Sequence, residues 1–218
     1  MRSTINLYNS DCLPAMRKMA DNQYDLAIVD PNYGIGEDGK KNHSRGKLAK
    51  PTLYDIKEWD KNSVDKIILD EILRVSKNQI IWGANHFISK MPFDSSCWII
   101  WDKENGENDF ADCELAWTSF DTAVRKFTFR WAGMLQGNMK HKETRIHPTQ
   151  KPVALYKWLL KNYAKPGYKI IDTHFGSLSI GIACWDAGYD LDAYEIDRDY
   201  FETGKKRLEN HKAQLQLY

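Results

Sequence analysis

Short runs of apolar and β-branched residues alternate along the chain with longer stretches in which apolar residues recur at helical spacing. The short runs predict six strands: Thr4–Tyr8, Tyr24–Asp30, Asn78–Trp82, Cys97–Asp102, Tyr168–Thr173 and Asp190–Ile196. The longer stretches predict five helices: Leu13–Ala20, Ser63–Val75, Val153–Ala164, Ser179–Ala187 and Asp199–Lys212. This alternation is typical of parallel strands joined by crossover helices. We therefore expect a doubly wound, mostly parallel α/β sheet with helices on both faces.

Four further segments lie outside this alternation. Glu114–Phe120 and Val124–Trp131 have the pattern of extended chain and predict a hairpin or a meander. Gly34–Leu53 and Trp131–His147 fit neither a strand nor a helix of the core, and long irregular connections within a compact domain are usually functional. The pattern therefore predicts one domain over residues 1–218, with two functional loops near 34–53 and 131–147.

The composition is that of an ordinary globular protein, with 218 residues, 42% of them hydrophobic and 28% charged. No stretch approaches the roughly 18 uninterrupted apolar residues that a membrane helix needs, so we expect a cytoplasmic protein without a membrane partner. The four cysteines stand far apart, without the paired spacing of a zinc site or the density of a disulfide framework. We expect structural thiols and no metal site.

The net charge is only +1, but the basic residues gather in two segments. The first segment contains Lys40, Lys41, Arg45 and Lys47, and the second contains Arg125, Arg130, Lys140, Lys142 and Arg145. Segregated basic segments in a near-neutral protein can bind a polyanion. A merely solvated surface is the alternative that the charge pattern leaves open.

One predicted strand stops abruptly at Asp30, Pro31, Asn32 and Tyr33. Asp-Pro-Asn by itself indicates a turn, because proline fixes its own φ and biases the residue before it to extended geometry. At the end of a strand in an α/β sheet, the same residues bring a carboxylate, a backbone carbonyl and an aromatic ring into one cleft. They are candidates for catalysis.

A second predicted strand ends at Asp172, and a turn with Gly176 leads from it into a helix. This arrangement lets a nucleotide-like ligand approach the backbone closely. The next strand carries Glu195 about 20 residues further on, where an acidic residue commonly binds ribose hydroxyls.

The hexapeptide from His147 to Pro152, HPTQKP, precedes a predicted helix. With it, the chain resembles the β-class amino-methyltransferases of DNA, found in bacteria and phages. HPTQKP matches a motif of that family letter for letter, DPNY is similar to its catalytic DPPY, and DTHFGS and YEID are similar to its cofactor-binding pair. The catalytic motif precedes the cofactor turn, as in the circularly permuted members of the family.

The resemblance implies a single catalytic domain with a seven-stranded-type methyltransferase sheet, the cofactor S-adenosylmethionine and double-stranded DNA as substrate. It also implies that the loops near 34–53 and 131–147 recognise the DNA. Asp30 and the carbonyl of Pro31 would hold the two amino hydrogens of a flipped base, and Tyr33 would stack on it. Asp11 would hold the cofactor's adenine and Glu195 its ribose. The methionine part would lie along Asp172, Thr173, Phe175, Gly176 and Ser177, with Thr149, Gln150 and Lys151 near its carboxylate.

Aspartate as the first residue of the catalytic motif goes mostly with adenine in the resembling family, so adenine is expected and cytosine is the alternative base. Two residues depart from the family pattern: Asn32 replaces a proline, and Leu178 stands where the cofactor turn usually has a second glycine. An RNA methyltransferase, a protein-amide methyltransferase and a non-catalytic cofactor-binding relic remain alternatives. A dinucleotide-dependent enzyme fits least, because the turn lacks three spaced glycines. A homodimer is left open.

Overall fold

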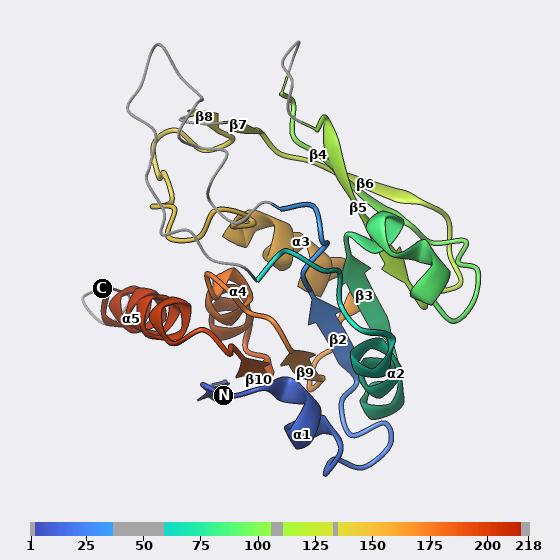
Figure 1. The fold of residues 1–218 in the computed structure, drawn as a ribbon. Helices are drawn as coiled ribbons and strands as arrows, with labels where there is room; N and C mark the ends of the chain where they lie inside the picture. Colours follow the sequence, from blue (N-terminus) through green and yellow to red (C-terminus); the bar gives the residue numbers. More distant parts are fainter. Residues whose placement is uncertain (1–2, 37–58, 106–110, 133–134, 215–218) are drawn as a thin grey trace.

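The structure is a computed structural model that describes residues 3–36, 59–105, 111–132 and 135–214 (Figure 1). In this part of the chain, eight strands form one sheet in the order β1-β10-β9-β2-β3-β5-β4-β6, and two more form a small hairpin, β7-β8. The strands are β1 Ile5–Tyr8, β2 Leu26–Val29, β3 Gln79–Trp82, β4 Ile99–Asp102, β5 Cys113–Thr118, β6 Arg125–Thr128, β7 Trp131–Ala132, β8 Leu135–Gln136, β9 Lys169–Asp172 and β10 Asp190–Tyr194. The helices are α1 Cys12–Met16, α2 Lys66–Val75, α3 Val153–Tyr163, α4 Ser179–Ala187 and α5 Arg198–Gln214, with short 3-10 turns η2 Ala84–His86 and η3 Ile88–Lys90.

All six predicted core strands and all five predicted helices are present, but α1 and α2 are each three residues shorter than their patterns. Helix α1 stops at Met16, where the chain turns and the guanidinium of Arg74 donates to the carbonyls of Met16 and Met19. Helix α2 starts at Lys66 instead of Ser63, since Ser63 is paired with Tyr33 in an isolated β-bridge.

The predicted hairpin or meander of Glu114–Phe120 and Val124–Trp131 is wrong in its pairing. Both segments are strands, but β4 lies between them: Ile99 pairs with Ala116 of the antiparallel β5 on one side and with Arg125 of the parallel β6 on the other. The sheet consequently has eight strands in place of the expected seven, and it is mostly parallel as expected. Because both edges of β4 are hydrogen-bonded, this apolar strand is not left at an open edge.

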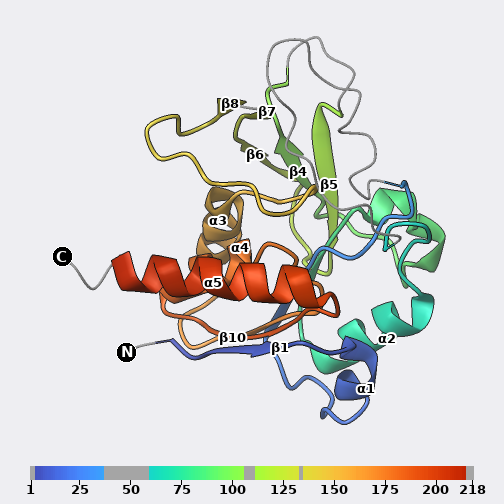
Figure 2. The ribbon, with the colours of Figure 1, turned by 60° about the vertical axis from the view of Figure 1, so that its left-hand side comes forward.

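The sheet separates two hydrophobic cores, as expected for helices on both faces. Along β2, Leu26 and Ile28 point toward the core beneath α3, α4 and α5, whereas Ala27 and Val29 point toward the core beneath α1 and α2. All four side chains are buried, which explains the continuous apolar run of this strand. Figures 1 and 2 show α5 and α2 on opposite faces of the sheet.

The chain reverses its winding between β9 and β2, which are neighbouring parallel strands. From β9 the chain continues through α4 on one face to β10, and from β2 it continues through α2 on the other face to β3. A doubly wound sheet binds its ligands where the winding reverses, beyond the carboxyl ends of the strands. Within the described residues, no helix has both the length and the apolar character needed to cross a membrane.

Candidate active site

The loop that follows β2 is fixed to the segment before α2. The backbone N–H groups of Tyr33 and Gly34 donate to Oδ1 of the buried Asp60 at 2.9 and 2.7 Å. Asn32, which departs from the family pattern, donates from its side chain to the carbonyl of Asn62 and accepts at its own carbonyl from Val64. Asn32 therefore adds an anchor that a proline would lack, and the loop presents Asp30 and Tyr33 in a defined arrangement.

The ring of Tyr33 has a fixed position above the end of β3. Its hydroxyl donates to Oδ1 of Asp30 at 2.6 Å, and its ring stacks on His86 with 5.2 Å between the centroids. Gly83 has φ of +69°, and a Cβ at this position would lie 2.0 Å from the ring of Tyr33. Only glycine provides both the left-handed backbone and the space that this ring occupies.

Lys151 lies at the centre of the site, with 3% of its surface exposed. Its ammonium is 2.5 Å from Oδ1 of Asp30 and 3.0 Å from Oε2 of Glu114, and it donates to the Tyr33 hydroxyl at 3.0 Å. The resemblance implied that this lysine approaches the cofactor's carboxylate. In this structure its ammonium contacts the predicted catalytic residues Asp30 and Tyr33 directly.

The charges of this cluster change one another's ionisation. Burial raises the pKa of Asp30, and Lys151 opposes that effect. Burial also raises the pKa of Glu114, but Lys151 and Lys103 outweigh it and bring the value down to about 2. Burial lowers the pKa of Lys151, but the two carboxylates outweigh it and raise the value. Lys151 is therefore charged at neutral pH, and Glu114 carries the compensating negative charge.

At the turn from β9 to α4, only one of the two carboxylate oxygens of the buried Asp172 is hydrogen-bonded within the described residues. Oδ1 of Asp172 accepts from the backbone N–H of His174 at 3.0 Å, whereas Oδ2 has no hydrogen-bond partner among the described residues. Burial raises the pKa of Asp172 well above its ordinary value. Gly176 in this turn has φ of +48°, and the ring of His147 lies against it. An unpaired, buried oxygen beside a glycine turn fits a ligand that brings its own hydrogen-bond donor.

Glu195 joins the end of β10 to the same turn. Its Oε2 accepts from the backbone N–H of Gly176 at 2.9 Å and its Oε1 accepts from the backbone N–H of Asp197 at 2.8 Å. Each oxygen keeps a second lone pair that a ribose hydroxyl could use. Asp11 is exposed and caps α1 by accepting from the N–H of Leu13 at 2.9 Å.

Three further residues of the turn are buried. The hydroxyl of Thr173 is 2.8 Å from the Nδ1 atom of His174, whose pKa burial lowers to about 4, so this imidazole is neutral at pH 7. Phe175 packs against Phe201 of α5, and the hydroxyl of Ser177 lies 3.1 Å from that of Ser179. These contacts make the turn a rigid part of the core.

Leu178 adopts the left-handed conformation, with φ of +57°, at the position where the family usually has glycine. Its side chain is fully buried, and a Cβ on Gly181 or on Gly204 would lie 2.7 or 3.2 Å from it. The two glycines make room for this side chain on the core side of the turn. A left-handed leucine costs roughly 1–2 kcal/mol, which this burial offsets.

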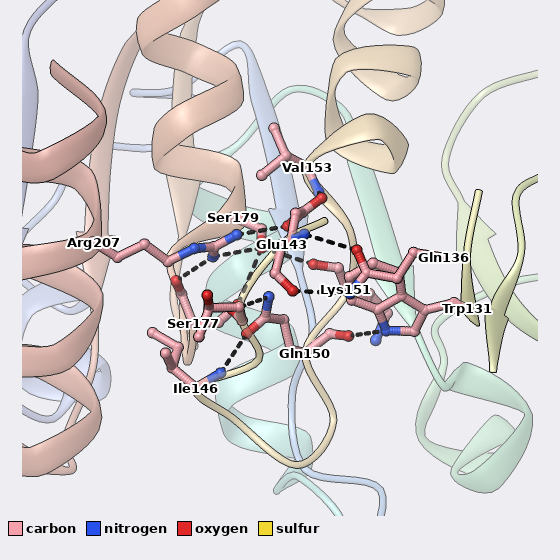
Figure 3. A network of polar contacts seen from close by, with 11 residues as sticks. Trp131, Gln136, Glu143, Ile146, Gln150, Lys151, Val153, Ser177, Ser179 and Arg207 are labelled. Carbon is pink, nitrogen blue, oxygen red and sulfur yellow. Dashed lines mark hydrogen bonds and ion pairs between the residues drawn. The ribbon is translucent and has the colours of Figure 1, made fainter. Parts of the chain in front are cut away.

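The HPTQKP segment is held mainly by contacts within the loop that precedes it (Figure 3). The side chain of the buried Gln150 accepts from the N–H of Ile146 at 2.9 Å, and its backbone carbonyl accepts from the indole of Trp131. Thr149 lies 3.1 Å from the ring of His147. Gln150 therefore shapes the loop, and of the three residues expected near the cofactor's carboxylate, Lys151 is the one that lies among charged groups.

An ion pair connects that loop to the last helix (Figure 3). Arg207 of α5 lies 2.6 Å from Glu143, whose other oxygen accepts from the N–H of Val153 at the start of α3. The same guanidinium donates to the carbonyl of Ser177 and to the hydroxyl of Ser179. The predicted recognition loop near 131–147 is thereby tied to the cofactor turn.

The predicted basic residues are not all on one side of the sheet. Arg125 begins β6 and lines a surface hollow together with Asn78 and Lys165, which precede the amino ends of β3 and β9, so it lies away from Asp30. Arg130, Lys140 and Lys142 are exposed and flank the β7–β8 hairpin along the chain. That hairpin lies beyond the carboxyl ends of β2 and β3 (Figures 1 and 2). Arg145 stacks over Trp131 at 4.6 Å. Lys40, Lys41, Arg45 and Lys47 lie outside the described residues.

Sequence reasoning missed three residues that contact the predicted ones: Glu114, His86 and Gly83. A signal for Gly83 was available, since a glycine directly after a buried strand often marks a close approach of another group. Glu114 gave a weaker signal, a lone acid within the alternating strand β5. Nothing in the sequence predicts that this strand lies beside β3.

Known proteins are similar to this chain in sequence or in fold. The type II methyltransferase M.HinfI of Haemophilus influenzae is 22% identical over 97% of this chain and 72% of its own length. A crystal structure of an M1.HpyAVI–SAM complex covers 94% of this chain and 100% of its own, with a TM-score of 0.55 and 19% identity. The PvuII DNA methyltransferase, which is cytosine-N4-specific, covers 98% of this chain and 92% of its own, with a TM-score of 0.60 and 10% identity.

Likeness at these identities shows the fold, and the family follows from a match to the sequence as a whole. A family model described as DNA methylase, N6_N4_Mtase, matches residues 24–206, far more than half of the chain. The matched range begins before β2 and extends into α5, so it includes both predicted motif strands and the HPTQKP segment. The chain belongs to the N6/N4 DNA methylase family.

Proposed function

We propose that the protein transfers the methyl group of S-adenosylmethionine to the exocyclic amino group of adenine in double-stranded DNA. The observation that carries this proposal is that two adjacent parallel strands end side by side. Asp30 and Tyr33 follow β2, and Asp172, whose Oδ2 has no hydrogen-bond partner among the described residues, ends β9. A base-holding group and a cofactor turn on adjacent strands suit a transfer between two bound ligands. The likeness to a solved SAM complex supports this choice of cofactor.

The turn after β9 fits S-adenosylmethionine, which supplies an electrophilic methyl group on a sulfonium. The unpartnered Oδ2 of Asp172 would accept from the ammonium of its methionine part. The remaining lone pairs of Glu195 would accept from the ribose hydroxyls, with Gly176 leaving room for the approach. Asp11 would hold the adenine amino group from the neighbouring strand end. Thr149 would lie at the rim of the site.

Asp30, Pro31 and Tyr33 would act on the target base. An aromatic amine is a poor nucleophile because its lone pair is delocalised into the ring. Asp30 would accept one amino hydrogen and the Pro31 carbonyl the other, which turns the lone pair toward the methyl group. Tyr33, whose ring stacks on His86, would stack on the base. The base would leave the duplex to reach them, at a cost of a few kcal/mol that stacking and hydrogen bonds offset.

Aspartate at the first position of the motif supports adenine as the target. Cytosine is the second candidate, because it also carries an exocyclic amino group beside a ring acceptor, and the PvuII enzyme of the same fold is cytosine-N4-specific. The deciding experiment is expression in cells that lack DNA methylation, followed by mass spectrometry of their nucleosides. N6-methyladenine is the expected product. N4-methylcytosine alone would overturn the base assignment, and no methylated base would overturn the activity.

Asp172→Asn is expected to weaken cofactor binding at least about tenfold and to stabilise the cofactor-free protein. Because the pKa of Asp172 is higher in the folded protein than in the unfolded chain, the folded state is favoured while the carboxyl is protonated. As the pH rises, ionisation of the buried carboxyl lowers the stability of the fold. Removal of the charge should therefore raise the free energy of unfolding by about 1 kcal/mol at pH 8, and by less at pH 5. Calorimetry with S-adenosylmethionine and urea unfolding measure the two effects.

Asp192→Asn on β10 is the matched control. Asp192 is also buried, but it accepts from Tyr24 at 2.6 Å and from Asn6 at 2.8 Å, and its pKa is lowered because these and Lys169 outweigh burial. The stability that the ionised Asp192 contributes is present at neutral pH and is lost as the pH falls through its lowered pKa, so Asp192→Asn should destabilise the protein at pH 8. Equal destabilisation by both variants would contradict the account of Asp172.

Replacement of Arg130, Lys140 and Lys142 by glutamine is expected to weaken DNA binding and its salt dependence. These residues are exposed and flank the β7–β8 hairpin along the chain, and that hairpin lies beyond the carboxyl ends of β2 and β3. Each phosphate contact that is lost lowers the slope of log affinity against log salt by about 0.9. Fluorescence anisotropy with a DNA duplex at several salt concentrations measures the slope.

Lys18→Gln combined with Lys165→Gln serves as the control for this experiment. Both lysines are exposed. Lys18 lies between α1 and β2 and Lys165 between α3 and β9, in segments that lead into the amino ends of these strands, away from the proposed DNA side. The control should keep the slope of the wild type. A slope that stays unchanged in the triple variant would mean that the β7–β8 region does not bind DNA.

A further inference from the structure

The two carboxylate oxygens of Asp30 have different surroundings. Oδ1 is contacted by the Tyr33 hydroxyl at 2.6 Å and by the ammonium of Lys151 at 2.5 Å. Among the described residues, no hydrogen bond and no ion pair reaches Oδ2. The side chain of Asp30 is 16% exposed. Two donors already occupy Oδ1, so an incoming donor finds Oδ2 available.

The ammonium of Lys151 is itself held on the side away from Asp30. Glu114 on β5 lies 3.0 Å from it and also forms an ion pair with Lys103. Asp30, Lys151, Glu114 and Lys103 form a row of alternating charge. Lys151 is the most buried of the four, with 2% of its side chain exposed. A lysine that is buried between two carboxylates has little freedom to move to a third partner, because either contact would have to be replaced.

We propose that Lys151, held by Glu114, is a positioning residue that fixes Asp30 through Oδ1 and thereby leaves Oδ2 to accept the amino hydrogen of the target base. This inference rests on the proposed function for the identity of the incoming donor. It departs from the role that the resemblance implied for Lys151, which was contact with the cofactor's carboxylate. It also assigns a role to Glu114, which the sequence did not mark as a site residue.

Lys151 also favours the ionised form of Asp30 against the burial that raises its pKa. The ionised form is the one the base needs, since a protonated carboxyl would offer it a donor in place of an acceptor. Asp30 is faced by Tyr33 from its own loop, by Lys151, by Glu114 of β5, by Asp172 of β9 and by Tyr156 of α3. Lys151 is the positive charge of this group, and it lowers the pKa of Asp30, whereas Glu114 raises it.

Two substitutions should therefore move the ionisation of Asp30 in opposite directions. Lys151→Met removes the positive charge, so Asp30 should protonate at higher pH than in the wild type. Glu114→Gln removes a negative charge and leaves Lys151 to Asp30 alone, so Asp30 should protonate at lower pH. A residue that only stabilises the fold has no reason to produce opposite shifts.

The first measurement needs no activity and no cofactor. Titration of the folded protein by carbon NMR, with labelled aspartate carboxyl groups and Asp30→Asn for assignment, should give the two opposite shifts. Shifts in the same direction, or no shift in either variant, would overturn the proposal. If Lys151→Met does not fold, Glu114→Gln decides by itself: an Asp30 titration that is unchanged or moved to higher pH overturns the proposal.

The second measurement separates positioning from cofactor binding. For Lys151→Met we expect kcat to fall by about a hundredfold, while the Kd for S-adenosylmethionine changes less than about threefold and Lys151→Arg recovers part of the rate. A large rise in Kd with kcat retained at saturating cofactor would overturn the proposal in favour of a cofactor contact. Lys157→Met, which removes an ion pair with Asp186 on the surface of α3, should keep the wild-type rate.

The two measurements also distinguish this inference from the proposed function. A wild-type protein that methylates no DNA would remove the proposed function, yet the NMR titration would still show whether Lys151 and Glu114 control Asp30. A wild-type protein that methylates DNA normally, with an Asp30 that neither variant affects, would remove the inference alone.

Discussion

Asp30→Ala is expected to lower the rate of methyl transfer by about a thousandfold, the largest effect of any single substitution in the site. The alanine cannot accept an amino hydrogen of the base, so the lone pair of the amine stays delocalised into the ring. Binding of S-adenosylmethionine should change less than about threefold, because Asp172 and Glu195 remain. Single-turnover transfer of a labelled methyl group and calorimetry measure the two quantities.

Asp70→Ala is the control for the loss of an aspartate. Asp70 lies on the exposed face of α2, where it pairs with Lys66 one turn away. An exposed pair of this kind is worth less than about 1 kcal/mol, so both the rate and the stability should remain close to those of the wild type. If Asp30→Ala kept more than a tenth of the wild-type rate, Asp30 would not hold the amine.

Gly83→Ala is expected to reduce methyl transfer at least about a hundredfold and to destabilise the fold by about 2–4 kcal/mol. An alanine at φ of +69° is strained, and its Cβ would lie 2.0 Å from the ring of Tyr33. The ring would have to leave its place, which breaks the hydrogen bonds of its hydroxyl to Asp30 and Lys151. Urea unfolding and transfer rates measure both effects.

Gly188→Ala separates the backbone strain from the collision. Gly188 ends α4 with φ of +77°, and a Cβ there meets no atom within 4 Å. This variant should lose about 1 kcal/mol of stability and keep its activity. Equal losses of stability and activity in the two variants would show that the contact between Gly83 and Tyr33 has no importance of its own.

Local patterns predicted the elements well and the pairing of distant strands poorly. The six core strands and five helices followed from hydrophobic periodicity because each buries one face or two faces of its own residues. The order β5-β4-β6 within the sheet did not follow from the sequence, since other orders of these strands satisfy the same alternation of apolar residues. Helix α1 ends early where it meets Arg74, which lies 58 residues along the chain from Met16.

The sequence by itself determined which segments can carry the chemistry of this family. Asp30 and Tyr33, the turn from Asp172 to Ser177, and the HPTQKP segment are local features, and their order along the chain matches the family. Their residue types follow from short-range requirements: a strand that stops, a glycine in a turn, and a helix entry with proline. For these features the local sequence was sufficient.

Only the tertiary structure decided which charges meet. Lys151 is 121 residues from Asp30 along the chain and 37 from Glu114, and no local pattern relates residues so far apart. Burial of the ammonium requires carboxylates from other strands, because an unpaired buried charge is costly. The folding of β2, β5 and the loop before α3 around one point supplies them, and that point gives Lys151 partners other than those the motif alone suggested.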